Sequence, residues 1–161
     1  MPEARLPEIT KQIARAVTVA AAHVDGPIRL TGHSAGGHLV TQLICQDGPL
    51  DPDTADRVER MVSISGLHDL RPLQLNSMNE KLGLTRDTAL SESAALRTPL
   101  HHVKVTAWVG AKERPEFLRQ SALLAENWGA DLVADPTRHH FDVIEGLSDP
   151  HHPLTNTLAG A

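Results

Sequence analysis

Apolar residues along the chain change between helical and strand-like spacing. Ile9, Ile13 and Val17 recur every four residues after Pro7, which is typical of one face of a helix that begins near that proline. Residues 103–109 (VKVTAWV) instead alternate apolar and polar side chains, which is typical of a strand. Helices and strands are expected to alternate along the whole chain, with four strands at residues 28–31, 60–65, 103–109 and 131–134.

This alternation predicts crossover helices that connect neighbouring strands of one parallel sheet. Helices are expected to begin at Pro7, Ser34, Pro115 and Pro153. The stretch 47–56 (DGPLDPDTAD) is expected to be a loop, and residues 67–99 to be irregular apart from a short helix near 90–96. Because no repeat or low-complexity linker interrupts the order, residues 1–161 are interpreted as one α/β domain.

Composition narrows the class of protein. A hydrophobic content of 40% is enough for a packed core, and a net charge of −5 with scattered charges argues against a nucleic-acid partner. The longest apolar stretch, residues 16–22, is too short to span a bilayer, and no signal peptide opens the chain. The single cysteine, Cys45, excludes an internal disulfide and favours a cytoplasmic location. Neither a nucleic-acid partner nor a membrane is therefore expected.

The sequence Gly32-His33-Ser34-Ala35-Gly36 lies where a predicted strand meets a predicted helix. Both glycines are expected to leave room for a sharp turn, because a side chain at either position would strike neighbouring backbone. A serine held exposed on such a turn is the nucleophile elbow of a hydrolase. The amino end of the following helix would face the same place, so the Ala35 N–H is the predicted oxyanion donor.

A serine nucleophile needs a base and an orienting carboxylate, and in hydrolases built this way the acid precedes the histidine in the chain. Glu113 lies four residues beyond the predicted strand 103–109, and Glu116 is its competitor inside the next helix. After strand 131–134, His140 precedes an apolar stretch, with His139 as the alternative. Ser34, Glu113 and His140 are therefore the predicted catalytic residues.

The segment 67–84 follows a predicted strand at the active end of the sheet, and it has two possible roles. Its apolar side chains offer a wall for substrate, and ordinary packing of a connecting loop explains them equally well; they include Leu70, Leu73, Leu75 and Met78. Asp69 is expected to be structural, and Cys45 to be buried packing. His33 and His38 are five residues apart and no cysteine pair supports them, so neither a metal nor another cofactor is expected.

Four segments in order carry a resemblance to a known family: GHSAGGHL, SGLHDLRPL, VGAKERPEFLRQS and HHFDVIEGL. The chain resembles the kynurenine formamidase (arylformamidase) branch of the α/β-hydrolases over nearly its whole length. The resemblance implies a three-layer fold with a mainly parallel sheet and a triad at Ser34, Glu113 and His140. It also implies a small-molecule substrate as the partner and metal-independent hydrolysis of N-formylkynurenine, or of related aryl amides and short esters.

One departure from the family changes what is expected of this chain. The family carries a His-Gly-Gly segment before the nucleophile that completes the oxyanion hole, whereas Gly26 is the only glycine before Gly32. The resemblance therefore implies that about four strands are present, the family's strands five to eight. Losing one oxyanion donor costs about 10²–10³ in rate, so weak hydrolysis or none is expected. Strand 28–31 would be a bare edge that favours a homo-oligomer, or a non-catalytic interaction module as the alternative function.

Overall fold

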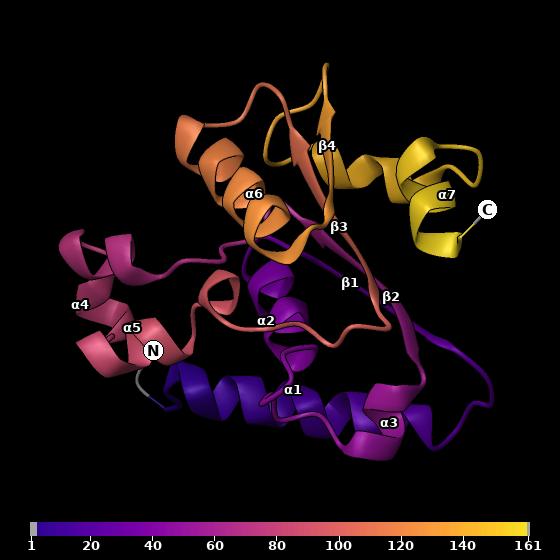
Figure 1. Cartoon of the computed structure of the whole chain (residues 1–161). Coiled ribbons are helices and arrows are strands. Elements are labelled where there is room, and N and C mark those ends of the chain that lie inside the picture. Colours follow the sequence, from indigo (N-terminus) through magenta and orange to yellow (C-terminus); the bar gives the residue numbers. More distant parts are fainter. Residues whose placement is uncertain (1–2, 161) are drawn as a thin grey trace.

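A parallel sheet of four strands lies at the centre of the computed structural model, which describes residues 3–160 (Figure 1). The strands follow one another across the sheet in chain order, and every neighbouring pair is parallel. Their bounds are Ile28–His33 (β1), Val58–Ile64 (β2), Lys104–Gly110 (β3) and Asp131–Asp135 (β4). The predicted parallel α/β fold is confirmed, with each strand within two residues of its expected bounds.

Helices connect these strands and cover the sheet. The α-helices span Leu6–Ala21 (α1), Ala35–Leu43 (α2), Pro52–Asp56 (α3), Asn79–Leu82 (α4), Arg86–Ser91 (α5), Pro115–Trp128 (α6) and Pro153–Ala159 (α7). Short 3₁₀ helices span Arg71–Leu75 (η1), Ala94–Leu96 (η2) and Val143–Ser148 (η3). Prolines stand in the first turns of α1, α6 and α7, where a missing backbone N–H costs nothing.

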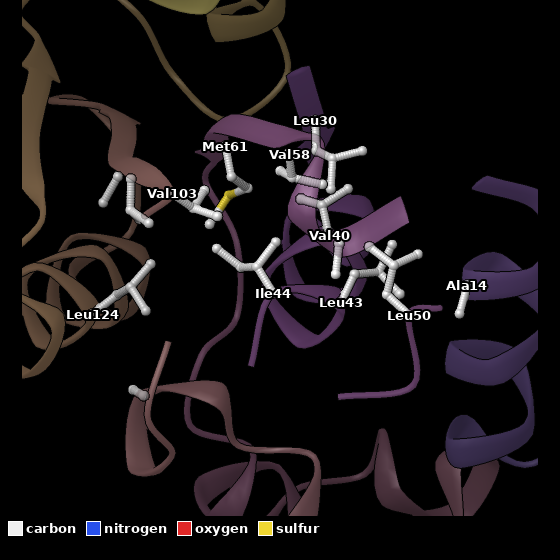
Figure 2. Packing of buried hydrophobic residues seen from close by; sticks show 14 residues of the cluster. Ala14, Leu30, Val40, Leu43, Ile44, Leu50, Val58, Met61, Val103 and Leu124 are labelled. Carbon is white, nitrogen blue, oxygen red and sulfur yellow. The ribbon is translucent and has the colours of Figure 1, made fainter. Parts of the chain in front are cut away.

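The side chains of β2 alternate between two cores, one on each face of the sheet. Met61 faces a large cluster that includes Leu43 and Ile44 near α2 and Leu124 of α6 (Figure 2). Its neighbour Val62 faces the other side, where a second cluster contains Ile64, Trp108 and Leu154. Because successive side chains of a strand point to opposite faces, the sheet is covered on both sides. The molecule therefore has three layers, with α2 and α6 on one face of the sheet and α7 on the other (Figure 1).

Two stretches differ from the sequence expectation. The predicted loop 47–56 contains α3, because the Asp51 carboxylate accepts hydrogen bonds from the Thr54 N–H (3.0 Å) and hydroxyl (3.1 Å) and so caps a new helix. The stretch 67–99, expected to be irregular apart from one helix near 90–96, also contains η1 and α4, and the expected helix is divided into α5 and η2. The hydroxyl of Thr85 accepts a bond from the Thr88 N–H at 3.2 Å, which starts α5 earlier than its apolar residues suggest.

Strand β1 forms one edge of the sheet and pairs with β2 alone among the described residues. Its other edge is not covered by any strand of residues 3–160, which leaves a row of backbone groups without ladder partners. Within the same range, no helix combines the length and apolar character needed to cross a membrane.

Candidate active site

Ser34 is the single residue between the end of β1 and the start of α2, and its backbone is strained. Its φ of 56° and ψ of −115° lie in a region that non-glycine residues rarely adopt. Strand β2 and helix α2 hold it there: its N–H donates to the Ile64 carbonyl of β2 at 2.9 Å, and its carbonyl accepts from the His38 N–H of α2 at 3.1 Å. The side chain remains partly exposed at the carboxyl end of β1.

The glycines around Ser34 differ in whether a side chain would fit in their place. A Cβ at Gly32 would lie 2.2 Å from the Gly36 carbonyl oxygen, so the turn requires glycine there. The same expectation was wrong for Gly36, where a Cβ would meet nothing within 4 Å. The second close approach occurs at Gly37 instead, whose Cβ would lie 2.8 Å from the Gly66 Cα because α2 crosses the end of β2 at this point.

Three side chains from distant parts of the sequence form one hydrogen-bonded chain. His140 Nε2 lies 3.1 Å from Ser34 Oγ, and His140 Nδ1 lies 2.8 Å from Glu113 Oε2. An ionised carboxylate can only accept, so the Glu113 contact assigns the ring proton to Nδ1. The lone pair of a neutral His140 is then on Nε2, which can accept the Ser34 hydroxyl proton.

His140 is held by contacts to both its backbone and its ring. His33 Nε2 donates to the His140 carbonyl at 2.7 Å, and this partner assigns the His33 ring proton to Nε2. The His140 ring lies between Phe117, with ring centroids 4.1 Å apart, and His33, with centroids 4.7 Å apart. The residue that precedes Ser34 therefore also orients the histidine that contacts Ser34.

Glu113 lies in a tight turn after β3 and its side chain is fully buried. The turn is closed by a hydrogen bond from the Glu113 N–H to the Gly110 carbonyl at 3.1 Å. The oxygen that does not contact His140, Oε1, accepts from the Gly110 N–H at 2.8 Å and from the Ser65 hydroxyl at 2.5 Å. Strand ends of β2 and β3 thus both contribute to orienting this carboxylate.

The competing residues from the sequence lie elsewhere. Glu116 is exposed on α6 and pairs with Arg119, whose guanidinium hydrogen bonds outweigh partial burial and lower the pKa of Glu116. His139 is exposed and lies 3.3 Å from Asp142 Oδ1. The same Asp142 oxygen accepts from the His139 N–H at 2.6 Å, which closes the loop that presents His140. Neither competitor therefore contacts Ser34 or Glu113.

A cavity of about 510 Å³ adjoins this hydrogen-bonded chain. Aromatic and basic residues dominate its lining, which also includes Glu113; the lining residues are Lys112, Glu113, Arg114, Phe117, His139, His140 and Phe141. Phe141 is 81% exposed as a residue, and its ring meets the His140 ring edge-on, with centroids 5.4 Å apart. A flat apolar group bound here would lie against the ring of Phe141 and next to His140.

The predicted substrate wall does not line this cavity. Leu70 is buried in a small cluster with Leu84 and Ala89, Leu73 packs against that cluster, and Met78 is exposed. These contacts match the packing alternative for the segment. The aromatic lining was missed because Phe117 and Phe141 each looked like part of a helical or apolar run.

Ala35 is exposed, and because it is the first residue of α2 its N–H has no acceptor within the helix. This N–H is therefore available at the site, as the predicted oxyanion donor must be.

The other residues considered in the sequence lie outside this site. The carboxylate of Asp69 accepts from Arg71 Nε and Nη2, both at 2.9 Å, and these guanidinium hydrogen bonds lower the pKa of Asp69. Burial raises the pKa of the Cys45 thiol to about 12, so this side chain is an inert packing group. Among residues 3–160, no three His, Cys, Asp or Glu side chains are grouped as metal ligands.

Comparisons with known proteins identify relatives of this chain, although no family model matches it. It is 30% identical to a kynurenine formamidase of Danio rerio over 84% of its own length and 49% of that protein. It is 27% identical to a kynurenine formamidase of Salmo salar, over 98% of this chain and 58% of the relative. The chain thus spans about half the length of the curated relatives it matches.

Solved structures show the same fold. A crystal structure described as a thioesterase from Silicibacter sp. TM1040 superposes with a TM-score of 0.93 at 47% identity, over 98% of this chain and 60% of the other. Esterase 2 of Thermogutta terrifontis shares the fold alone, with a TM-score of 0.60 at 18% identity over 94% of this chain and 59% of the esterase. The chain therefore has the α/β-hydrolase fold and is kynurenine formamidase-like in sequence, as predicted.

Proposed function

We propose that this protein is a metal-independent serine hydrolase of the arylformamidase or carboxylesterase type. The observation that carries the proposal is the hydrogen-bonded chain from Ser34 Oγ through His140 to Glu113 at the carboxyl ends of parallel strands. A serine on a strained turn, a histidine with an unprotonated Nε2 and a buried carboxylate on its Nδ1 are the three parts that acyl transfer requires.

In this mechanism the Ser34 oxygen attacks the formyl or acyl carbonyl of the substrate while His140 Nε2 takes the hydroxyl proton. Glu113 accepts from Nδ1 and stabilises the imidazolium that forms. The Ala35 N–H donates to the oxyanion of the tetrahedral intermediate. His140 then gives its proton to the departing amine or alkoxide. A water molecule, deprotonated by His140, attacks the acyl-serine and releases formate or another acid.

The cavity beside His140 supports an aromatic substrate. Phe117 and Phe141 offer apolar rings, and Lys112 and Arg114 bring positive charge to the same rim. An aryl formamide that carries a carboxylate, such as the N-formylkynurenine suggested by the relatives, matches both features. A short aryl ester such as p-nitrophenyl acetate uses the rings alone and is the simpler probe.

The test replaces the nucleophile. Ser34→Ala is expected to abolish hydrolysis of p-nitrophenyl acetate and N-formylkynurenine, and to abolish labelling by a fluorophosphonate probe. Ser77→Ala, which removes an exposed hydroxyl far from His140 in the sequence, is the matched control and is expected to react like the parent. Undiminished turnover or labelling in Ser34→Ala would contradict the proposal.

A second candidate function, strand pairing with another chain, is favoured by one observation. The outer edge of β1 has no strand beside it within residues 3–160. A second copy of the chain could pair there, with or without catalysis.

A further inference from the structure

Ser65 follows β2 directly and has the only positive φ besides Ser34 among the described non-glycine residues. Its φ is 51°, and its side chain is completely buried. The Ser65 N–H donates to the Trp108 carbonyl of β3 at 2.7 Å. A buried serine held in left-handed backbone costs stability, and such strain is most often found at functional sites.

The strained backbone directs the Ser65 hydroxyl at the acid of the predicted triad. Ser65 Oγ donates to Glu113 Oε1 at 2.5 Å, across 48 residues of sequence. The Gly110 N–H donates to the same oxygen at 2.8 Å. With Oε1 held by two donors from the ends of neighbouring strands, the other oxygen, Oε2, is directed to His140 Nδ1.

The donors to Glu113 matter because its carboxylate is buried. The Glu113 side chain has no exposed surface, so water cannot replace a lost partner. Three donors satisfy the carboxylate: Ser65 Oγ, Gly110 N–H and His140 Nδ1. Removing the hydroxyl leaves Oε1 with one backbone donor, and the carboxylate can then rotate away from the position in which it accepts from His140.

We propose that Ser65 is a positioning residue that orients Glu113 toward His140. The inference rests on the proposed function, because the consequence it predicts for turnover requires that Ser34 be the nucleophile. Ser65 touches neither substrate nor Ser34 in this role; it acts through Glu113. If Ser65 were purely structural, only its backbone conformation would matter. Any residue that tolerates a positive φ, such as glycine, could then replace it without loss of activity.

Two variants separate the hydroxyl from the backbone. Ser65→Ala removes the hydroxyl and keeps the strain, whereas Ser65→Gly removes the hydroxyl and relieves the strain. Ser63→Ala is the matched control, because Ser63 is equally buried on β2 but its Oγ lies 3.3 Å from His68 Nε2 and not at the triad. All three are compared with the parent in the full chain.

Two measurements are made on each variant. Both Ser65 variants are expected to lower kcat for p-nitrophenyl acetate about tenfold with KM little changed, the effect of one lost hydrogen bond to a buried charge. The low-field proton resonance of His140 Nδ1–H is expected to move upfield and to exchange faster with water in both. Ser63→Ala is expected to leave kcat and the resonance unchanged.

The outcomes separate this inference from the proposed function. Parent-like kcat and resonance in Ser65→Gly would overturn the positioning role, as would equal losses in Ser63→Ala. If Ser65→Ala does not fold, the Gly variant decides. Because the resonance is measured without substrate, it also decides the inference if turnover is too slow to measure. Turnover that survives in Ser34→Ala would instead reject the proposed function.

Discussion

His33 links the two halves of the candidate site at the scale of single residues. It precedes Ser34 in the chain, and its Nε2 donates to the carbonyl of His140 at 2.7 Å. It therefore connects the turn that bears the hydroxyl to the loop that bears the imidazole. The ring contact between His33 and His140 adds packing to this hydrogen bond.

The role of this hydrogen bond can be measured with a ring that cannot donate. His33→Phe keeps an aromatic ring beside His140 and loses the donor, so the rate of fluorophosphonate labelling at Ser34 is expected to fall about three- to tenfold, as for one neutral hydrogen bond. His33→Gln retains an N–H donor and is expected to lose less. A labelling rate in His33→Phe equal to that of the parent would show that the bond does not position His140.

Single residues also show how far the sequence could predict this site. Ser34, Glu113 and His140 each follow a predicted strand, and the ends of parallel strands meet at one edge of a sheet, so their proximity was predictable. Ser65 and His33, whose partners lie 48 and 107 residues away, were missed because no motif or chain order marks them as it marks the triad. A hydrogen bond across that separation depends on side-chain directions that periodicity does not contain.

The turn between β1 and α2 gives a sharp prediction at the scale of elements. Gly32→Ala places a methyl group 2.2 Å from the Gly36 carbonyl oxygen, so β1 and α2 must separate and stability is expected to fall by about 2–4 kcal/mol. Gly36→Ala is the matched control, because its methyl group enters open space and alanine favours a helix by about 0.5–1 kcal/mol.

Urea unfolding followed by circular dichroism measures both variants. A Gly36→Ala midpoint at or above that of the parent, together with a much lower midpoint for Gly32→Ala, is the expected pair of results. Equal destabilisation of the two would contradict the asymmetry of this turn and would restore the simpler view that both glycines of the motif are required sterically.

The helix start marked by proline was predicted, whereas the starts set by the side-chain caps Asp51 (α3) and Thr85 (α5) were missed. Proline starts α6, and Gly129 ends it at a φ of 62°, both of which are readable from the chain. The segment between β2 and β3 was harder, because its apolar residues pack against one another: Leu70 against Leu84 and Ala89. Whether such residues face substrate or each other depends on tertiary contacts, which the sequence pattern leaves open.

His68 makes the stability of the whole molecule depend on pH. Complete burial, with a smaller contribution from His38 nearby, lowers the pKa of His68 from 6.5 to about 3. Folding therefore requires the neutral ring, while the unfolded chain binds a proton below pH 6.5. Stability from this group is fully present above that pH and is lost as the pH falls toward about 3.

Denaturant unfolding at several pH values between 7 and 4 tests this linkage. The parent is expected to lose stability steadily below pH 6.5, and His68→Asn, which cannot titrate, is expected to show a shallower dependence whatever its stability at pH 7. His151→Asn is the control, because the ring of His151 is exposed. Parallel pH profiles for the parent and His68→Asn would show that another group controls the acid sensitivity.

The free edge of β1 determines how whole molecules are expected to associate. The Ser34 N–H bonds to β2, so by alternation along the strand the N–H groups of Arg29 and Thr31 point to the open edge. An open edge next to apolar Ile28 and Leu30 favours pairing with another strand. We expect the 161-residue chain to self-associate as its concentration rises, as measured by sedimentation velocity.

Arg29→Pro tests whether association uses this edge. Proline removes an N–H that points away from β2, so the hydrogen bonds between β1 and β2 are kept. A strand of a second molecule would lack this donor and would pair less well with β1. The variant is expected to shift the sedimentation profile toward monomer with an unchanged circular dichroism spectrum, and to retain fluorophosphonate labelling at Ser34. A parent that stays monomeric at every concentration, or a variant that associates as readily as the parent, would remove β1 as the interface and leave hydrolysis as the single proposed function.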